Sequence, residues 1–123
     1  ELVQNFTYLL EKRYGNNLRL HMGPPQKEGF ILPMTLQMLV ENAVKHNIIS
    51  EKYPLDLFIT CDEDGYVTVK NSLQPKSKPE PSTQFGLQSI IRRYQLLSDR
   101  KVIIEKNDSS FIVRIPIIKK SNT

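Results

Sequence analysis

Residues 32–47, LPMTLQMLVENAVKHN, have the spacing of an amphipathic helix. Pro33 suits the first turn of such a helix, because a backbone N–H is not needed there. Apolar side chains recur three and four residues apart, which predicts one buried stripe against a neighbouring layer. This stripe is made of Leu36, Leu39, Val40, Ala43 and Val44. We therefore predict a helix over residues 33–47 that packs on a hydrophobic core.

The opposite side of the predicted helix carries groups that can bind or react. At about 100° per residue, four residues lie roughly opposite the apolar stripe, and His46 lies towards one edge. The four are Met38, Glu41, Asn42 and Lys45. In an ordinary amphipathic helix they form a solvated face, on which a Glu41–Lys45 pair contributes about 0.2–0.5 kcal/mol. Alternatively they line a binding site, and the rest of the sequence bears on that choice.

The sequence before this helix predicts one further helix and one strand. Residues 2–14 place apolar side chains three and four apart until Gly15, a residue typical of a helix end. The alternating pattern of NLRLHM, residues 17–22, predicts a strand. The side chains on one side of this strand are those of Leu18, Leu20 and Met22.

Two strands separated by a tight turn follow the 33–47 helix. LDLFITC (residues 55–61) and YVTVKN (residues 66–71) have strand patterns, and Gly65 in DEDG can adopt the positive φ of a hairpin turn. Residues 72–83, SLQPKSKPEPST, contain three prolines and few large apolar groups. We expect this segment to be a mobile surface loop, because it offers little to bury.

The C-terminal part predicts a second helix and a closing hairpin. Gly86 opens the helix, whose buried stripe is Leu87, Ile90, Ile91, Tyr94 and Leu97. KVIIEK (residues 101–106) and SFIVRIPII (residues 110–118) then pair across NDSS. Helices among strands that are joined mainly by hairpins predict an α+β two-layer sandwich, in which a mainly antiparallel mixed sheet has its helices on one face.

Length and composition indicate one folded globular domain over residues 1–123. Hydrophobic residues make up 39% and charged residues 24% of the chain, unlike a disordered sequence. The sequence begins at Glu1 in mid-pattern, so we expect it to be a segment of a longer protein. The single cysteine, Cys61, excludes an intrachain disulfide and favours a reducing, cytosolic setting. The net charge of +4 is spread along the chain, so we expect no direct nucleic-acid binding.

The string LQMLVENAVKHN, residues 36–47, resembles the N box of the LytS/YehU-type sensor histidine kinases. YLLEKRYGNNLRL is similar to the helix and strand before that box, FGLQSIIRRYQLL to the last glycine box and its helix, and VIIEKNDSSFIVRIPI to the final hairpin. The resemblance implies the GHKL (Bergerat-type) fold, an α/β sandwich that binds ATP between its helix layer and a flexible ATP lid. Residues 72–83 are the candidate lid.

The resemblance also implies roles for the polar residues of the 33–47 helix. Asn42 would bind a Mg²⁺ ion that bridges the phosphates of ATP, and Glu41 would act as, or orient, a general base. Lys45 and His46 would face the phosphate end. An amide oxygen suits Mg²⁺, which prefers oxygen ligands, and a lysine charge favours phosphoryl transfer. His21 has no motif around it, so we expect a structural role.

Two further boxes depart from the family pattern. Asn71 stands where an adenine-binding Asp is expected; its side-chain oxygen can still accept from the adenine amino group, but without the strength that a charge adds. In the next box Gln84 replaces a glycine. Thr83, Gly86 and Leu87 are retained and are expected to bind nucleotide, since Gly86 lies where unpaired helix N–H groups favour phosphate.

These features favour the catalytic domain of a bacterial two-component sensor histidine kinase, which transfers the γ-phosphoryl group of ATP to a histidine outside this chain. The expected partners besides ATP are the histidine-containing dimerisation segment of the parent protein and a LytTR-type response regulator. We expect a cytoplasmic domain of a homodimeric parent in the bacterial inner membrane. The alternative is a degenerate kinase-like scaffold that binds nucleotide weakly or not at all, which the missing Asp and glycines favour.

Overall fold

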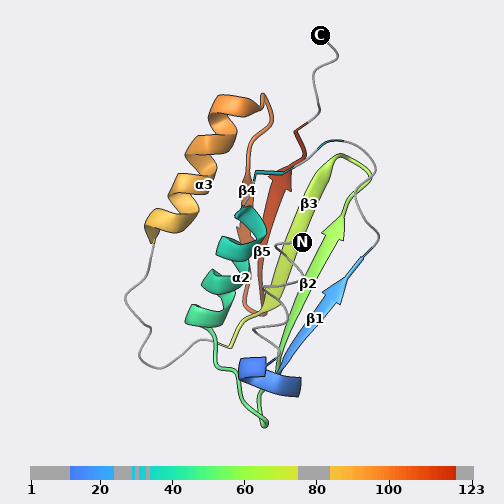
Figure 1. Cartoon of the computed structure of the whole chain (residues 1–123), viewed down its shortest axis with the longest axis vertical. Coiled ribbons are helices and arrows are strands. Elements are labelled where there is room, and N and C mark those ends of the chain that lie inside the picture. Colours follow the sequence, from blue (N-terminus) through green and yellow to red (C-terminus); the bar gives the residue numbers. More distant parts are fainter. Residues whose placement is uncertain (1–11, 24–28, 30, 33, 75–83, 119–123) are drawn as a thin grey trace.

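The computed structural model describes residues 12–23, 29, 31–32, 34–74 and 84–118. Their elements form two layers, a sheet and a pair of helices that cover one of its faces (Figure 1). This arrangement confirms the predicted α+β two-layer sandwich. In chain order the elements are η1 (Gly15–Asn17), β1 (Leu18–Met22), α2 (Thr35–His46), β2 (Leu55–Cys61), β3 (Tyr66–Ser72), α3 (Gln84–Leu97), β4 (Ile103–Lys106) and β5 (Ser110–Pro116).

The strands lie in the order β1-β2-β3-β5-β4. β1 runs parallel to β2, with Leu18 opposite Leu55, whereas the other neighbouring strands are antiparallel. A parallel pair needs a crossover connection, and α2 lies in this connection between β1 and β2. The turn between β2 and β3 is the predicted one, with Gly65 at φ +85°. The sheet is therefore mixed and mainly antiparallel, as predicted.

The hydrophobic core lies between the helices and the sheet. Alternate residues of the central strands are buried, because side chains along a strand point to opposite faces. The same face receives the apolar stripes of both helices, whose central residues are buried as predicted. The core includes Leu57 and Ile59 of β2, Val67 and Val69 of β3, Val113 and Ile115 of β5, Leu39, Val40 and Ala43 of α2, and Ile90 and Tyr94 of α3.

The predicted stripes are wrong in places. Leu97, predicted to be buried, is 54% exposed, because it is the last residue of α3, where the opposing layer covers less of the helix. Met22, at the end of the edge strand β1, is likewise 56% exposed. Met38, predicted on the polar side of α2, is half-buried and packs against the core. α3 begins at Gln84, so Gly86 lies in its first turn and does not open it.

Some predictions extend beyond the described residues. Residues 2–11 and Pro33 lie outside them, while residues 12–14 are helical. Of the predicted mobile loop, residues 75–83 lie outside them too. Its first residues are hydrogen-bonded: Ser72 pairs in β3, and the N–H of Leu73 donates to Ser109 O at 3.0 Å. Within the described ranges, no helix is both long and apolar enough to cross a bilayer.

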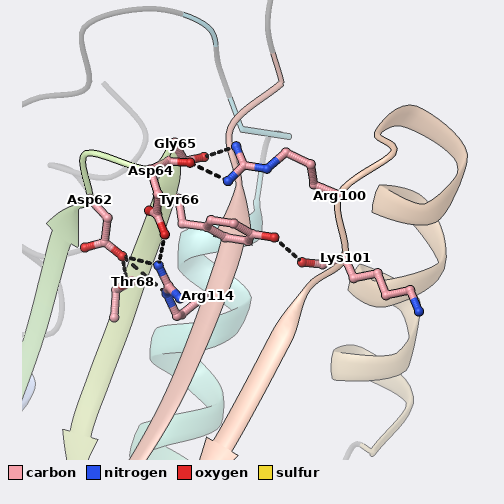
Figure 2. A network of polar contacts seen from close by, with 8 residues as sticks. All are labelled: Asp62, Asp64, Gly65, Tyr66, Thr68, Arg100, Lys101 and Arg114. Carbon is pink, nitrogen blue, oxygen red and sulfur yellow. Dashed lines mark hydrogen bonds and ion pairs between the residues drawn. The ribbon is translucent and has the colours of Figure 1, made fainter.

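Arg114 of β5 fastens the turn between β2 and β3 (Figure 2). Its Nη2 atom lies 2.9 Å from Asp62 Oδ2 and 2.6 Å from Asp64 Oδ2. The Thr68 hydroxyl donates to the same Asp62 carboxylate at 2.7 Å. Hydrogen bonds to Asp64 and then to Asp62 raise the pKa of the Arg114 guanidinium. The guanidinium carbon also lies 4.8 Å from the Tyr66 ring centre, so Arg114 joins two carboxylates and an aromatic ring.

Arg100 holds the same turn from the other side of Tyr66 (Figure 2). It donates to the backbone oxygens of Asp64 and, at 3.2 Å, of Gly65, and its guanidinium carbon lies 4.2 Å from the Tyr66 ring centre. Gly65 has φ +85°, a conformation that favours glycine, and a Cβ atom there would also displace the flexible end of the Arg100 side chain. The turn is thereby fixed at the beginning of β3, whereas Asn71 lies near the end of that strand.

Candidate functional site

α2 and α3 lie side by side and run in opposite directions (Figure 1). Near the end of α3, the Tyr94 hydroxyl lies 3.0 Å from the hydroxyl of Thr35, the first residue of α2. The last turn of α2, with His46, therefore lies towards the start of α3. β3 also ends on that side (Figure 1). Three segments that carry predicted site residues thus meet at one end of the domain: the end of α2, the end of β3 and the start of α3.

The end of α2 carries four of the predicted site residues: Glu41, Asn42, Lys45 and His46. All four are half-buried, so this face is not a fully solvated stripe. The Glu41 carboxylate accepts a hydrogen bond of 3.4 Å from the Gln37 side chain. Lys45 and His46 lie in the last turn, where a positive charge also complements the helix dipole. The predicted site and a purely structural role are both compatible with their position.

Asn71 is a buried polar residue on the helix-facing side of the sheet. It is 3% exposed and follows the buried residues Val67 and Val69 in alternation. Its Nδ2 atom donates to the carbonyl oxygen of Ser72 at 2.8 Å. The donor end of the amide therefore has a partner within the protein, and the oxygen is the end that can accept from an adenine amino group.

The start of α3 supplies backbone N–H groups. The first four N–H groups of a helix have no partner within the helix, and Gly86 lies among them. Leu87 is half-buried, and its side chain packs against the core, so its contribution to a ligand would come from its backbone. Thr83, the other residue predicted in this box, lies outside the described residues.

Asn47 has no predicted role, yet it connects two of these segments. It follows α2, is 3% exposed, and donates from Nδ2 to Ala43 O at 2.8 Å. Its Oδ1 accepts the backbone N–H of Gln74 at 2.7 Å. An Asn directly after a helix is a sequence signal for a helix cap. Nothing in the sequence predicts that its second partner is Gln74, which lies 27 residues away.

The described residues contain no group of three or more His, Cys, Asp or Glu side chains that could hold a metal ion. A Mg²⁺ ion at this site would therefore take most of its ligands from phosphates and water. Mg²⁺ is commonly bound in this way, with few protein ligands. The half-buried amide of Asn42 fits the single oxygen ligand that such an ion would need from the protein.

A pocket of about 400 Å³ lies elsewhere and contains none of the predicted site residues. It lies beside the C-terminal end of α3, opposite the end where the three segments meet. Its lining is mainly apolar and consists of Leu32, Met34, Arg93, Leu96 and Leu97. We assign the candidate site to the convergent polar residues, because Arg93 is the one charged residue in the mainly apolar lining of this pocket and none of the predicted site residues lies there.

His21, predicted to be structural, lies on the sheet face away from the helices. It alternates along β1 with the partly buried core residue Leu20, and its Nε2 atom lies 2.9 Å from Asp56 Oδ1. Its ring stacks on Phe58, with centroids 4.5 Å apart. The hydrogen bond from His21, followed by that from Arg19, lowers the pKa of Asp56. These contacts join β1 to β2 and lie outside the candidate site.

Comparison with solved structures relates this geometry to known proteins. The catalytic domain of histidine kinase ThkA superposes with a TM-score of 0.58 at 19% identity, over 97% of this chain and 93% of that one. The chain has the fold of a histidine kinase catalytic domain. The histidine kinase AdeS of Acinetobacter baumannii gives a TM-score of 0.57 at 14% identity, over 94% of this chain. The blue-light activated histidine kinase EL346 of Erythrobacter litoralis gives 0.56 at 11% identity, also over 94%.

The chain spans 62% of the AdeS structure and 40% of the EL346 structure. No protein-family model matches the sequence. No curated protein sequence matches it either. At these identities the structural likeness establishes the fold alone.

Proposed function

We propose that this chain is the ATP-binding catalytic domain of a bacterial two-component sensor histidine kinase of the LytS/YehU type. It transfers the γ-phosphoryl group of ATP to a histidine that lies outside these 123 residues. The observation that carries this proposal is the meeting of the Asn42 helix, the Asn71 strand end and the start of α3 at one end of a histidine kinase fold.

Each segment has a distinct part in this proposal. The buried Asn71 oxygen accepts from the adenine amino group, and the N–H groups of the first turn of α3, including that of Gly86, bind phosphate. Asn42 supplies a neutral oxygen to Mg²⁺, which leaves the charge of the ion for the phosphates. Lys45 and His46 lie towards the phosphate end, and Thr83 and Leu87 complete the nucleotide contacts.

Phosphoryl transfer requires mainly positioning and stabilisation of charge. Bound Mg²⁺ would neutralise charge that develops on the transferred group. Glu41 acts as a general base or orients the receiving histidine, and its hydrogen bond to Gln37 holds the carboxylate on the helix surface. Lys45 adds a positive point charge one turn further along α2.

The proposal extends to partners that lie outside the chain. The receiving histidine lies on a dimerisation segment of the parent protein, and a LytTR-type response regulator takes the phosphoryl group onward. The parent is a homodimer in the bacterial inner membrane, with this domain on the cytoplasmic side. The sequence resemblance at residues 36–47 supports this finer assignment. We expect no autophosphorylation of the fragment alone.

Calorimetric titration with ATP and Mg²⁺ tests the proposal. The wild-type domain should bind ATP, and Asn42→Ala should lose the Mg²⁺-dependent part of the affinity while remaining folded, because Asn42 is not a core residue. Gln95→Ala, at an exposed position of α3, is the matched control and should bind as the wild type does. Equal Mg²⁺-ATP affinity in Asn42→Ala and wild type would remove Asn42 from the site.

A degenerate scaffold domain is the second candidate. The observation that favours it is Asn71, because a neutral amide that donates to Ser72 O stands where a carboxylate is expected. This candidate predicts weak or absent heat of ATP binding in wild type, with no Mg²⁺-dependent loss in Asn42→Ala. The same titration therefore separates the two functions.

A further inference from the structure

The side chain of Asn47 makes one hydrogen bond to each of two segments. Nδ2 donates to the carbonyl oxygen of Ala43 in the last turns of α2, at 2.8 Å. Oδ1 accepts from the backbone N–H of Gln74, just after β3, at 2.7 Å. The residue is 3% exposed, so water cannot readily replace either bond. Both ends of one buried amide are thus used to join a helix to a strand exit.

Backbone and side-chain bonds reinforce this contact. The N–H of Ile48 donates to Gln74 O at 2.7 Å, so Gln74 is held through both of its backbone groups. The Gln74 side chain also donates to Ile48 O at 2.8 Å and to Tyr53 O at 3.3 Å. The Asn47–Ala43 bond is buried and the Asn47–Gln74 bond is partly buried, whereas the Gln74 side-chain bonds are exposed.

The joint lies close in the chain to two residues of the proposed site. Asn42 lies on α2, five positions before Asn47, and Asn71 lies near the end of β3, three positions before Gln74. A ligand that contacts both Asn42 and Asn71 requires a fixed spacing between α2 and the end of β3. Small displacements of binding groups are costly, because hydrogen bonds weaken steeply with distance and angle.

We propose that Asn47 is a positioning residue of the nucleotide site, which sets α2 against the end of β3 and thereby the spacing between Asn42 and Asn71. This inference rests on the proposed function, since it assigns a role within that site. Asn47 does not contact the nucleotide itself. It acts through its hydrogen bonds to Ala43 of α2 and to Gln74, which follows β3.

The test compares two substitutions that each remove buried hydrogen bonds at opposite ends of α2. Asn47→Ala removes the joint beside the site, and Tyr94→Phe removes the hydroxyl contact at the far end of the helix. Both should lower the free energy of unfolding. ATP binding is measured by calorimetry well below the melting temperatures. It should weaken about tenfold in Asn47→Ala, which corresponds to the loss of about one or two hydrogen bonds between the displaced site residues and the nucleotide. It should change less than about twofold in Tyr94→Phe.

Hydrogen exchange in the free protein provides the readout that does not need nucleotide. The amide of Gln74 should exchange at least about tenfold faster in Asn47→Ala, since its acceptor is gone. In Gln74→Ala the same amide should stay slow, because the Asn47 oxygen remains. Should Asn47→Ala fail to fold, Asn47→Ser replaces it, because one short hydroxyl cannot bond both Ala43 O and Gln74 N–H.

Each outcome has a defined meaning. Weaker ATP binding in Asn47→Ala with faster Gln74 exchange, and neither in Tyr94→Phe, supports the positioning role. Unchanged ATP binding in Asn47→Ala, or an equal loss in Tyr94→Phe, overturns it and leaves the proposed function standing. If the wild type binds no ATP, the proposed function fails, and the positioning role fails with it.

Discussion

The buried hydroxyl groups of Tyr94 and Thr35 lie 3.0 Å apart, and the same Tyr94 oxygen accepts the backbone N–H of Leu32 at 2.8 Å. One side chain of α3 therefore holds both the chain entering α2 and the first residue of that helix. This contact holds the first residue of α2, whereas Asn47 bonds to Ala43 in the last turns of the helix, which carry the predicted site residues.

Tyr94→Phe should destabilise the domain. The substitution leaves the Leu32 N–H and the Thr35 hydroxyl without their partner in a buried position, and such a loss typically costs about 1–3 kcal/mol. Urea denaturation measures the change. Tyr53→Phe is the matched control: that ring is 49% exposed, and its substitution should change the unfolding free energy by less than about 0.5 kcal/mol. Equal stability of Tyr94→Phe and wild type would contradict a stabilising role for the hydroxyl.

The same tyrosine predicts a loss of stability at alkaline pH. Burial raises the pKa of Tyr94 above its ordinary value of about 10. The folded state therefore keeps a proton that the unfolded state releases, so stability is fully present below pH about 10 and falls as the pH rises further towards the folded pKa. Melting temperatures between pH 8 and 11 should fall more in wild type than in Tyr94→Phe, which has no proton there to lose. Parallel curves would show that Tyr94 does not cause the decline.

The lowered pKa of Asp56 predicts that stability is lost as the pH falls into the acidic range. The His21 hydrogen bond, and after it the Arg19 contacts, lower the pKa of Asp56 in the folded state. Its contribution to stability is present above the unfolded value of about 3.9 and is lost as the pH falls through the folded pKa. Thermal melts from pH 5 to 2 should show a shallower acid loss in Asp56→Asn than in wild type. A steeper loss in the variant would reverse the assigned sign.

Arg114→Lys should weaken the turn between β2 and β3 although it keeps the charge. A lysine cannot reach Asp62 and Asp64 together while stacking on Tyr66, because these contacts use the planar guanidinium. The groups are partly exposed, so we expect a loss of about 1 kcal/mol in chemical denaturation. Arg92→Lys, at an exposed position on α3, is the control and should leave the free energy of unfolding unchanged. If Arg114→Lys is as stable as the wild type, a single charge is sufficient at this turn.

Asn71→Asp should bind ATP more tightly than wild type and be less stable. A carboxylate accepts more strongly from the adenine amino group, and the difference between charged and neutral hydrogen bonds, about 1 kcal/mol, corresponds to roughly tenfold in affinity. The carboxylate cannot donate to Ser72 O, which is where stability is lost. Calorimetry and denaturation measure the two effects separately. Unchanged or weaker ATP binding would exclude residue 71 from adenine recognition.

Hydrophobic periodicity predicted the helices and strands well where the helix layer packs against the sheet. The LDLFITC strand matches β2 residue for residue, and the apolar stripe of α2 is buried at Leu39, Val40 and Ala43. Leu97 shows the limit of the pattern, because helical spacing continues to the end of α3 while the opposing layer does not. Pattern alone also does not determine that β1 pairs in parallel with β2, since a strand pattern does not contain its partner.

The candidate site was predictable only as a string of residues. The motif around Asn42 marks the helix, and strand alternation places Asn71 on the buried side. The tie between these two segments was not predictable, because it depends on Asn47 meeting the backbone of Gln74, and any residue except proline offers the same N–H. A contact to a backbone N–H does not depend on the type of the partner residue, so the sequence does not reveal it.

The parallel pairing of β1 with β2 has a consequence for how the domain folds. It joins residues 37 positions apart, Leu18 to Leu55, whereas β2 with β3 and β4 with β5 are neighbours in the chain. Short loops close early and long ones late, so we expect both hairpins to form before β1 arrives. α2 lies inside the long loop between β1 and β2, and its final placement therefore follows the formation of the hairpins. Until β1 pairs with β2 and β5 pairs with β3, both edges of the β2–β3 hairpin stay unpaired, and a chaperone or a misfolded neighbour would bind there first.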